Sequence, residues 1–225
     1  MLSGKGADLS MPDHAECGAG MSQALTRAQW FVIVLFALIA LAAIPGAGLA
    51  ADEGSGDQRP NGPLITELGA IIGYGNGTIA ESDYTTLLII AHIGMDMNRF
   101  IPALRDNRGT LSFFLEPQFN PVFTPSSQYE FGLGIGLQYA YPVTEFISPY
   151  ILGVTGPQYI SVNTAQQANG LNFASAVGAG LYFSLTKNTS LNVGYRYRHV
   201  SNANLKQPNG GINSQIVLMG LSFFF

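Results

Sequence analysis

Thiol and histidine chemistry is nearly absent from this chain of 225 residues. It contains one cysteine, Cys17, and three histidines, of which only His92 and His199 follow residue 50. Cys17 precedes the apolar run of the N-terminal region, so a chain cleaved after that run has no thiol for a disulfide, for redox chemistry or for lipid attachment. Two histidines exclude a histidine-rich metal cluster. We therefore expect neither a bound metal nor another cofactor.

Charge and long apolar runs are also scarce. Charged residues make up 11% of the chain, and from Asp52 onward eight Lys or Arg stand against eleven Asp or Glu, a net charge of −3. This balance argues against a nucleic-acid partner. Although 47% of all residues are apolar, no apolar run after residue 50 is long enough for a membrane-spanning helix. A membrane protein that crosses the bilayer with strands remains compatible with this composition.

The first 50 residues have the features of a cleaved signal peptide. An apolar stretch, Trp30–Ile44, is followed by Pro45 and by small residues up to Ala50, which is the pattern of a signal-peptidase site. We predict a signal peptide at residues 1–50, with Met21 as an alternative start because a more ordinary basic segment follows it. The other interpretation is a single anchoring helix, but Pro45 shortens its span.

Beyond residue 63, apolar residues alternate with small or polar ones in segments of about 9 to 11 residues, bounded by turn residues. In the clearest segment, the odd positions from Tyr129 to Tyr141 are apolar, whereas the even positions are Glu, Gln, Ala or Gly. The eight predicted strands are 64–74, 84–97, 110–119, 128–141, 146–155, 170–184, 190–201 and 214–225. An apolar exterior around a small, polar interior is typical of membrane barrels. We therefore predict an all-β fold, an eight-stranded antiparallel transmembrane β-barrel at residues 64–225, after a periplasmic N-terminal segment at 51–63.

The interior of this barrel is predicted to be charged but closed. Glu67, Glu116 and Glu130 fall on inward positions, as do Arg196 and Arg198. A pore or a proton path is one interpretation of these charges. A packed interior of ion pairs is the other, and we favour it because a small barrel is filled by its own side chains and an unpaired buried charge is costly. His92 also points inward, where we expect a hydrogen-bonded interior residue.

The seventh predicted strand ends in an unusual polar pair on its apolar face. With short periplasmic turns and both termini in the periplasm, this strand ends at the cell exterior, so His199 and Ser201 point toward lipid near the outer interface. Asn213, at the start of the eighth strand, points the same way beside His199. Cα atoms two residues apart on a strand are separated by about 6.6 Å, so the imidazole can serve as general base for the hydroxyl. The structural interpretation is a polar rim that only solvates the strand end, since His-x-Ser is common by chance.

A dense motif covers these residues. Tyr195–Asn213 (YRYRHVSNANLKQPNGGIN) closely resembles the signature of the lipid A 3-O-deacylase family, outer-membrane barrels of Gram-negative bacteria. The resemblance implies that Ser201 is the nucleophile and His199 the base, and that the substrate is the ester-linked acyl chain at the 3-position of lipid A. It also implies that Asn202 and Asn209 help to form an oxyanion hole.

One position departs from the family pattern. Where family members place a glutamate to orient the histidine, this chain has Asn213, whose amide oxygen can accept the imidazole N–H but supplies no negative charge to stabilise imidazolium. No Asp or Glu follows Glu145, so a replacement carboxylate would have to come from elsewhere, and Glu81 and Asp83 follow the first strand. We predict that Asn213 itself orients His199.

Together these features predict an outer-membrane serine esterase of a Gram-negative bacterium that removes the 3-O-linked acyl chain of lipid A from the outer leaflet. Its expected partners are lipid A, or lipopolysaccharide, and other outer-membrane lipids. Lys206 could attract a lipid A phosphate, although an exposed loop lysine is more often only solvated. The apolar girdle would also accommodate a homodimer contact. The alternatives are a catalytically weak or inactive relative with a structural or lipid-binding role, and a small adhesin-like barrel.

Overall fold

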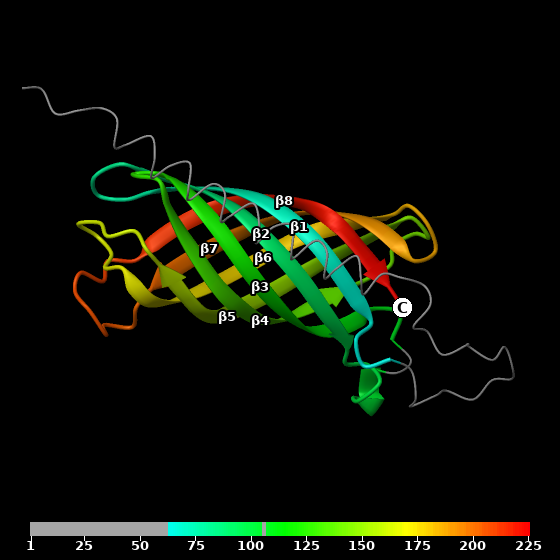
Figure 1. Cartoon of the computed structure of the whole chain (residues 1–225). Coiled ribbons are helices and arrows are strands. Elements are labelled where there is room, and N and C mark those ends of the chain that lie inside the picture. The colour runs from blue at the N-terminus through cyan, green and yellow to red at the C-terminus, as the bar shows by residue number, and fades with distance from the viewer. Residues whose placement is uncertain (1–62, 105–106) are drawn as a thin grey trace, which may run out of the picture.

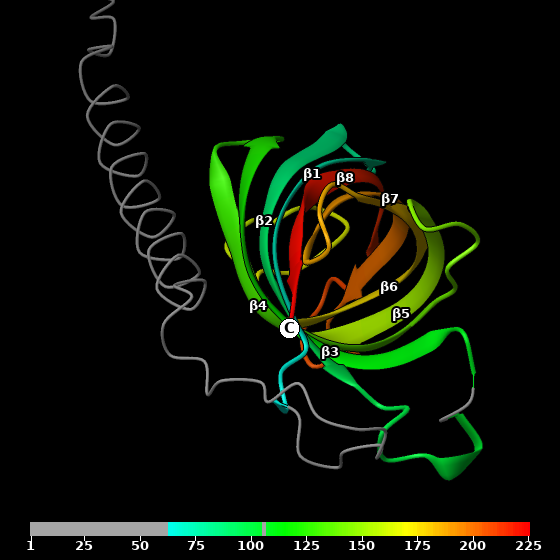
Figure 2. The ribbon, with the colours of Figure 1, turned by 90° about the vertical axis from the view of Figure 1, so that its right-hand side faces the viewer.

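The structure is a computed structural model that describes residues 63–104 and 107–225, and its eight antiparallel strands close into a barrel (Figure 1). The strands are β1 (Glu67–Thr78), β2 (Asp83–Asp96), β3 (Thr110–Thr124), β4 (Gln128–Ala140), β5 (Ile147–Ile160), β6 (Gly170–Ser184), β7 (Thr189–Ser201) and β8 (Ile212–Phe224). Each strand pairs with the next along the chain, and β1 also pairs with β8, which completes the ring seen in Figure 2. The predicted all-β, eight-stranded antiparallel barrel is confirmed.

The described residues begin at residue 63. The predicted signal peptide at 1–50, with its alternative start at Met21, therefore lies outside them, and so does the predicted periplasmic segment at 51–63 except for its last residue. Within the part of the chain that is described, no helix has the length and apolar character needed to cross a membrane.

The two ends of the barrel differ in what they carry. The first strand begins, and the last strand ends, at the same end, where Glu67 pairs with Phe224; we call this the terminal end (Figure 1). The opposite end, the loop end, carries the connections 79–82, 125–127, 161–169 and 202–211. The terminal end carries 97–109, 141–146 and 185–188. Of these, 97–109 contains the 3-10 helix η1 (Pro102–Leu104) and is longer than the short turns expected there.

Three strands extend further toward the loop end than predicted. β1 continues to Thr78, β3 to Thr124 and β5 to Ile160. The sequence pattern indicated strand ends at glycines and prolines, but cross-strand pairing continues through Pro121, opposite Tyr129, and through Pro157, opposite Phe173. Each proline is paired on one side only. The pairing of β3 with β2 skips Pro121 and that of β5 with β4 skips Pro157, as expected for a residue that has no N–H to donate.

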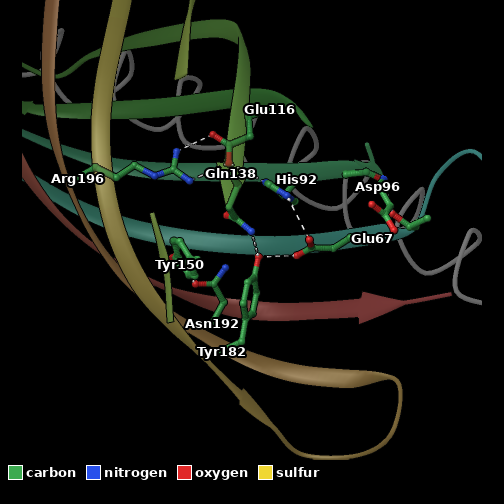
Figure 3. A network of polar contacts seen from close by, with 11 residues as sticks. Glu67, His92, Asp96, Glu116, Gln138, Tyr150, Tyr182, Asn192 and Arg196 are labelled. Atoms are coloured by element: carbon green, nitrogen blue, oxygen red, sulfur yellow. Dashed lines mark hydrogen bonds and ion pairs between the residues drawn. The ribbon is translucent and has the colours of Figure 1, made fainter. Parts of the chain in front are cut away.

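Inside the barrel, the predicted ion pairs form. Arg196 binds Glu116 through two N–H···O contacts of 2.6 and 2.8 Å, and His92 Nδ1 lies 2.9 Å from the same carboxylate (Figure 3). Glu67 accepts a hydrogen bond of 2.8 Å from the Tyr182 hydroxyl. All these side chains are at least nine-tenths buried. The interior charges are therefore paired, and His92 is the interior residue that the sequence predicted.

A second buried cluster lies nearer the loop end. Arg198 donates to Glu130 at 2.7 Å, and the Tyr84 hydroxyl donates to the same carboxylate at 2.6 Å. Beyond it, an apolar layer fills the mouth of the barrel: Ile79, Tyr84, Val122, Ile160, Val162, Val200 and Ile212. Val200 and Ile212 pair across β7 and β8. The end of β7 and the start of β8 are thus held by a packed interior, which gives the outward residues beside them fixed positions.

Candidate active site

His199 and Asn213 face each other across β7 and β8 on the outer wall of the barrel. Both side chains are exposed, between inward neighbours that are buried. His199 Nδ1 lies 2.8 Å from Asn213 Oδ1. Because a carbonyl oxygen can only accept, Nδ1 carries the proton and Nε2 is left with its lone pair. This is the tautomer that a general base needs.

Ser201 lies two residues beyond His199 on the same face of β7 and is half-buried. Among the described residues, no hydrogen bond joins its Oγ to His199 or to any other group. The structure thus brings His199 and Asn213 into contact, but it shows no contact between His199 and Ser201. Hydrogen bonds between a nucleophile and its base often shorten only when substrate binds.

The connection 202–211 folds back against the histidine. Gly211 has a φ of 76°, a backbone conformation that glycine adopts without strain. A Cβ atom at this position would lie 2.5 Å from Cε1 of His199. Only a glycine therefore lets the loop pack against the imidazole ring. This packing restricts the rotation of the His199 side chain.

Asn202 and Asn209 organise this loop. The Asn202 backbone N–H donates to Asn209 Oδ1 at 2.8 Å, and its side-chain amide donates to the Lys206 carbonyl at 2.7 Å. Asn202 is buried, with 1% of its surface exposed, because its position continues the inward face of β7. The Asn209 amide donates to Asn204 Oδ1 at 3.0 Å. Asn202 follows Ser201 directly, and Asn209 is bonded to the Asn202 backbone. Their predicted oxyanion role stays a prediction.

Lys206 is exposed in the same loop, and its Nζ donates to Asn169 Oδ1 at 2.7 Å. It is the only basic residue in the four connections at the loop end. Its predicted contact with a lipid phosphate also stays a prediction.

The carboxylates considered as substitutes lie elsewhere. Glu81 Oε1 accepts a hydrogen bond of 2.6 Å from the backbone N–H of Ala165, so it joins the connections 79–82 and 161–169. Asp83 begins β2 and is exposed. In the described part of the chain neither carboxylate contacts His199, which has Asn213 as its hydrogen-bond partner.

A groove that the sequence analysis missed runs along the outer wall beside the site. Its volume is about 720 Å³, and its lining includes Ile135, Gly153, Thr155, Ser175, Val177 and Tyr197. Ser175 pairs with His199 across β6 and β7, so the groove begins next to the imidazole and extends toward the terminal end. Small outward residues create it: a Cβ at Gly153 would meet no atom within 4 Å. Gly, Thr and Ser at outward positions of a lipid-facing wall were the signal in the sequence.

Metal ligands do not gather in this region. Residues 63–104 and 107–225 contain no group of three or more His, Cys, Asp or Glu side chains placed to hold a metal ion.

Comparison with known proteins relates this site to a family. A model of the family described as lipid A 3-O-deacylase (PagL) matches residues 78–222, a range that includes the whole candidate site. The lipid A deacylase PagL of Pseudomonas aeruginosa is 41% identical over 71 residues, which make up 30% of this chain and 39% of that protein. The match therefore spans less than half the length of this relative.

Two solved structures are similar to this chain, and the first of them supports the fold. Neisserial surface protein A (NspA) matches with a TM-score of 0.55 and 16% identity over 71% of this chain and 96% of that one. The outer membrane enzyme PagL matches with a TM-score of 0.47 and 22% identity over 68% and 97%. The barrel, its apolar outer wall and the family match place the protein in the outer membrane of a Gram-negative bacterium. Because the family match covers more than half of its residues, the chain belongs to the lipid A 3-O-deacylase family.

Proposed function

We propose that this protein is a serine esterase that removes the 3-O-linked acyl chain of lipid A in the outer leaflet of the outer membrane. Ser201 is the nucleophile, His199 the general base and Asn213 the group that orients the imidazole. The observation that carries the proposal is the hydrogen bond between His199 Nδ1 and Asn213 Oδ1 on the lipid-facing wall. Polar side chains gain nothing from lipid there, so a role in chemistry accounts for their position.

The reaction follows from the free groups of the site. Ser201 Oγ attacks the carbonyl carbon of the ester while His199 Nε2 takes the hydroxyl proton, which gives a tetrahedral intermediate. The intermediate collapses when the C–O bond to the sugar breaks and His199 returns the proton to the departing sugar oxygen. Water then attacks the acyl-enzyme, with His199 again as base, and releases the 3-hydroxy fatty acid.

The intermediate's oxyanion needs donors close to Ser201. The connection 202–211 supplies candidates, namely its backbone N–H groups and the side-chain amide of Asn209. The Asn202 amide is a weaker candidate than the sequence indicated, because its side chain is buried on the inward face and donates to the Lys206 carbonyl. Donors held in place before the reaction stabilise developing charge most effectively, and the hydrogen bonds within this loop provide such order.

The surroundings fit an acylated, phosphorylated lipid. The groove beside His199 offers space for the acyl chain along the outer wall, and Lys206 at the loop end is the cation available to a lipid A phosphate. In this arrangement the ester lies at the boundary between sugar and acyl chains, level with Ser201.

A second candidate function is a catalytically weak or inactive family relative that binds lipid. The observation that favours it is Asn213, since an amide supplies no negative charge to the imidazolium formed during attack.

Mass spectrometry of lipid A from cells that express the protein tests the proposal. We expect loss of one 3-hydroxyacyl chain with the wild type, and unchanged lipid A with Ser201→Ala and with His199→Ala. Ser161→Ala, which alters another serine at the loop end, serves as the matched control and should deacylate like the wild type. Unchanged lipid A despite correctly folded wild-type protein at the surface would favour the inactive relative.

A further inference from the structure

Gln167 is a fully buried polar residue in the connection 161–169, outside the motif that carries the proposed chemistry. Its side chain makes three hydrogen bonds: Nε2 donates to Asn172 Oδ1 at 2.7 Å and to Asn209 Oδ1 at 3.3 Å, and Oε1 accepts from the Gly211 backbone N–H at 2.8 Å. A buried amide with all these partners costs free energy to disturb, because each partner would be left unsatisfied.

The hydrogen bond from the Gly211 N–H connects Gln167 to the residue that packs against the imidazole. Gly211 packs against the ring of His199, and Gln167 holds the N–H of this glycine. The neighbouring Gln166 holds its carbonyl, since Gln166 Nε2 donates to Gly211 O at 2.5 Å. The connection 161–169 thus forms hydrogen bonds with both the N–H and the carbonyl of Gly211, and the ring of His199 packs against this residue.

The hydrogen bond to Asn209 connects Gln167 to the chain that follows Ser201. Asn209 Oδ1, which Gln167 contacts, also accepts from the backbone N–H of Asn202, the residue after Ser201. The backbones of the two connections also bond to each other, at Ala168 N to Pro208 O and at Gly210 N to Gln166 O. Gln167 therefore contacts both Asn209 and Gly211 of the connection that follows Ser201 and packs against His199.

We propose that Gln167 is a positioning residue of the esterase site, which fixes the imidazole of His199 through Gly211 and the chain after Ser201 through Asn209. This inference rests on the proposed function, because it assigns Gln167 a role in the same reaction. Gln167 does not touch the reacting atoms. It acts by keeping the loop in the one arrangement in which imidazole and hydroxyl can meet at the ester.

The test compares steady-state deacylation of lipid A in detergent micelles by purified wild type, Gln167→Leu and Gln167→Met. Both variants keep the approximate volume and remove all three hydrogen bonds. Misplacement of catalytic groups by about 1 Å lowers rates by roughly 100-fold, so we expect kcat to fall by about 10- to 100-fold while KM changes by less than about threefold. A folded variant whose kcat stays within twofold of the wild-type kcat would overturn the proposal.

Two controls separate positioning from folding. Ser161→Ala removes hydrogen bonds of the same connection to Gln128 and Tyr129, and Gln138→Leu removes a buried hydrogen bond to Tyr182 in the barrel interior. Both should keep the wild-type kcat. If both Gln167 variants fail to fold, as judged by circular dichroism melting, while both controls fold, Gln167 is a folding residue and the proposal is wrong.

A double-mutant comparison adds a signature that a purely structural role lacks. If Gln167 acts through His199, Gln167→Leu should slow the residual reaction of His199→Ala by much less than it slows the wild type. The same factor in both backgrounds would overturn the role assigned to Gln167 through Gly211 and His199. Failure of the proposed function is distinguishable, because the wild type itself would then leave lipid A intact.

Discussion

The side-chain oxygen of Asn213 accepts a hydrogen bond of 2.8 Å from Nδ1 of His199, across the β7–β8 pair and on the outside of the barrel. The geometry of a base and its orienting partner is present, but the partner is neutral. In the proposed reaction, Asn213 fixes the tautomer of the imidazole without stabilising the positive charge that the ring would acquire on taking a proton.

Asn213→Glu should therefore raise kcat. A hydrogen bond to a charged partner is stronger than a neutral one by about 1 kcal/mol, which corresponds to roughly a fivefold gain in rate. Asn213→Ala should lower kcat by about tenfold or more, because the ring loses the one hydrogen bond that holds it among the described residues. Initial rates of deacylation with the purified variants measure both effects.

Glu81→Ala is the matched control for Asn213, since Glu81 bonds to Ala165 rather than to His199. We expect it to retain activity. Deacylation that survives Asn213→Ala but is abolished by Glu81→Ala or by Asp83→Ala would contradict the assignment of Asn213.

The groove on the outer wall predicts selection by acyl length. Acyl chains are surrounded by apolar groups both in the bilayer and in the groove, so the groove supplies shape rather than a hydrophobic driving force. Gly153→Phe, which fills open space there, should lower kcat/KM for long-chain esters by about tenfold while short-chain esters react normally, if the positioning of the chain accounts for this part of catalysis. Rates for a series of esters of increasing length measure the effect.

Ala179→Phe is the control for the groove, because Ala179 is also outward on β6 but does not line it. Equal losses for both variants would mean that bulk on the wall, and not the groove, governs the rate.

The buried pair Glu116 and Arg196 predicts an effect on stability alone (Figure 3). Removing one partner of a buried pair typically costs about 3–5 kcal/mol, since the other charge stays buried and unpaired. Glu116→Leu should therefore lower the free energy of unfolding by about that amount, and the double change Glu116→Leu, Arg196→Met should recover much of it. Urea unfolding in detergent, followed by circular dichroism, measures both. A double variant less stable than Glu116→Leu would contradict this account of the interior.

The fold was predictable because the solvent outside a membrane barrel is apolar and the space inside is narrow. Each outward position of β4 therefore carries a large apolar side chain and most inward ones a small or polar group, and the same rule placed Arg196 and His92 inside. Strand ends were less predictable. Prolines such as Pro121 and Pro157 usually end strands, but each keeps a cross-strand partner on one side, and β3 and β5 continue past them.

The site was predictable only in part. His199, Ser201 and Asn213 share one face because strand parity and topology determine it, and both can be derived from the sequence. Gln167 could not be found in this way. Its contact with Gly211 depends on how the connections 161–169 and 202–211 pack together once the barrel has closed. The residue pattern of 161–169 does not predict that packing.

Covalent labelling tests the central claim most directly, namely that Ser201 is an activated nucleophile on the lipid-facing wall. Purified protein in lipid A-containing micelles is treated with a long-chain alkyl fluorophosphonate, and the modified residue is located by peptide mass spectrometry. We predict one label, on Ser201, which is absent in Ser201→Ala, slow in His199→Ala and delayed by competing lipid A. Deacylation of lipid A by wild-type protein that carries no label on Ser201, or that persists in Ser201→Ala, would contradict the account.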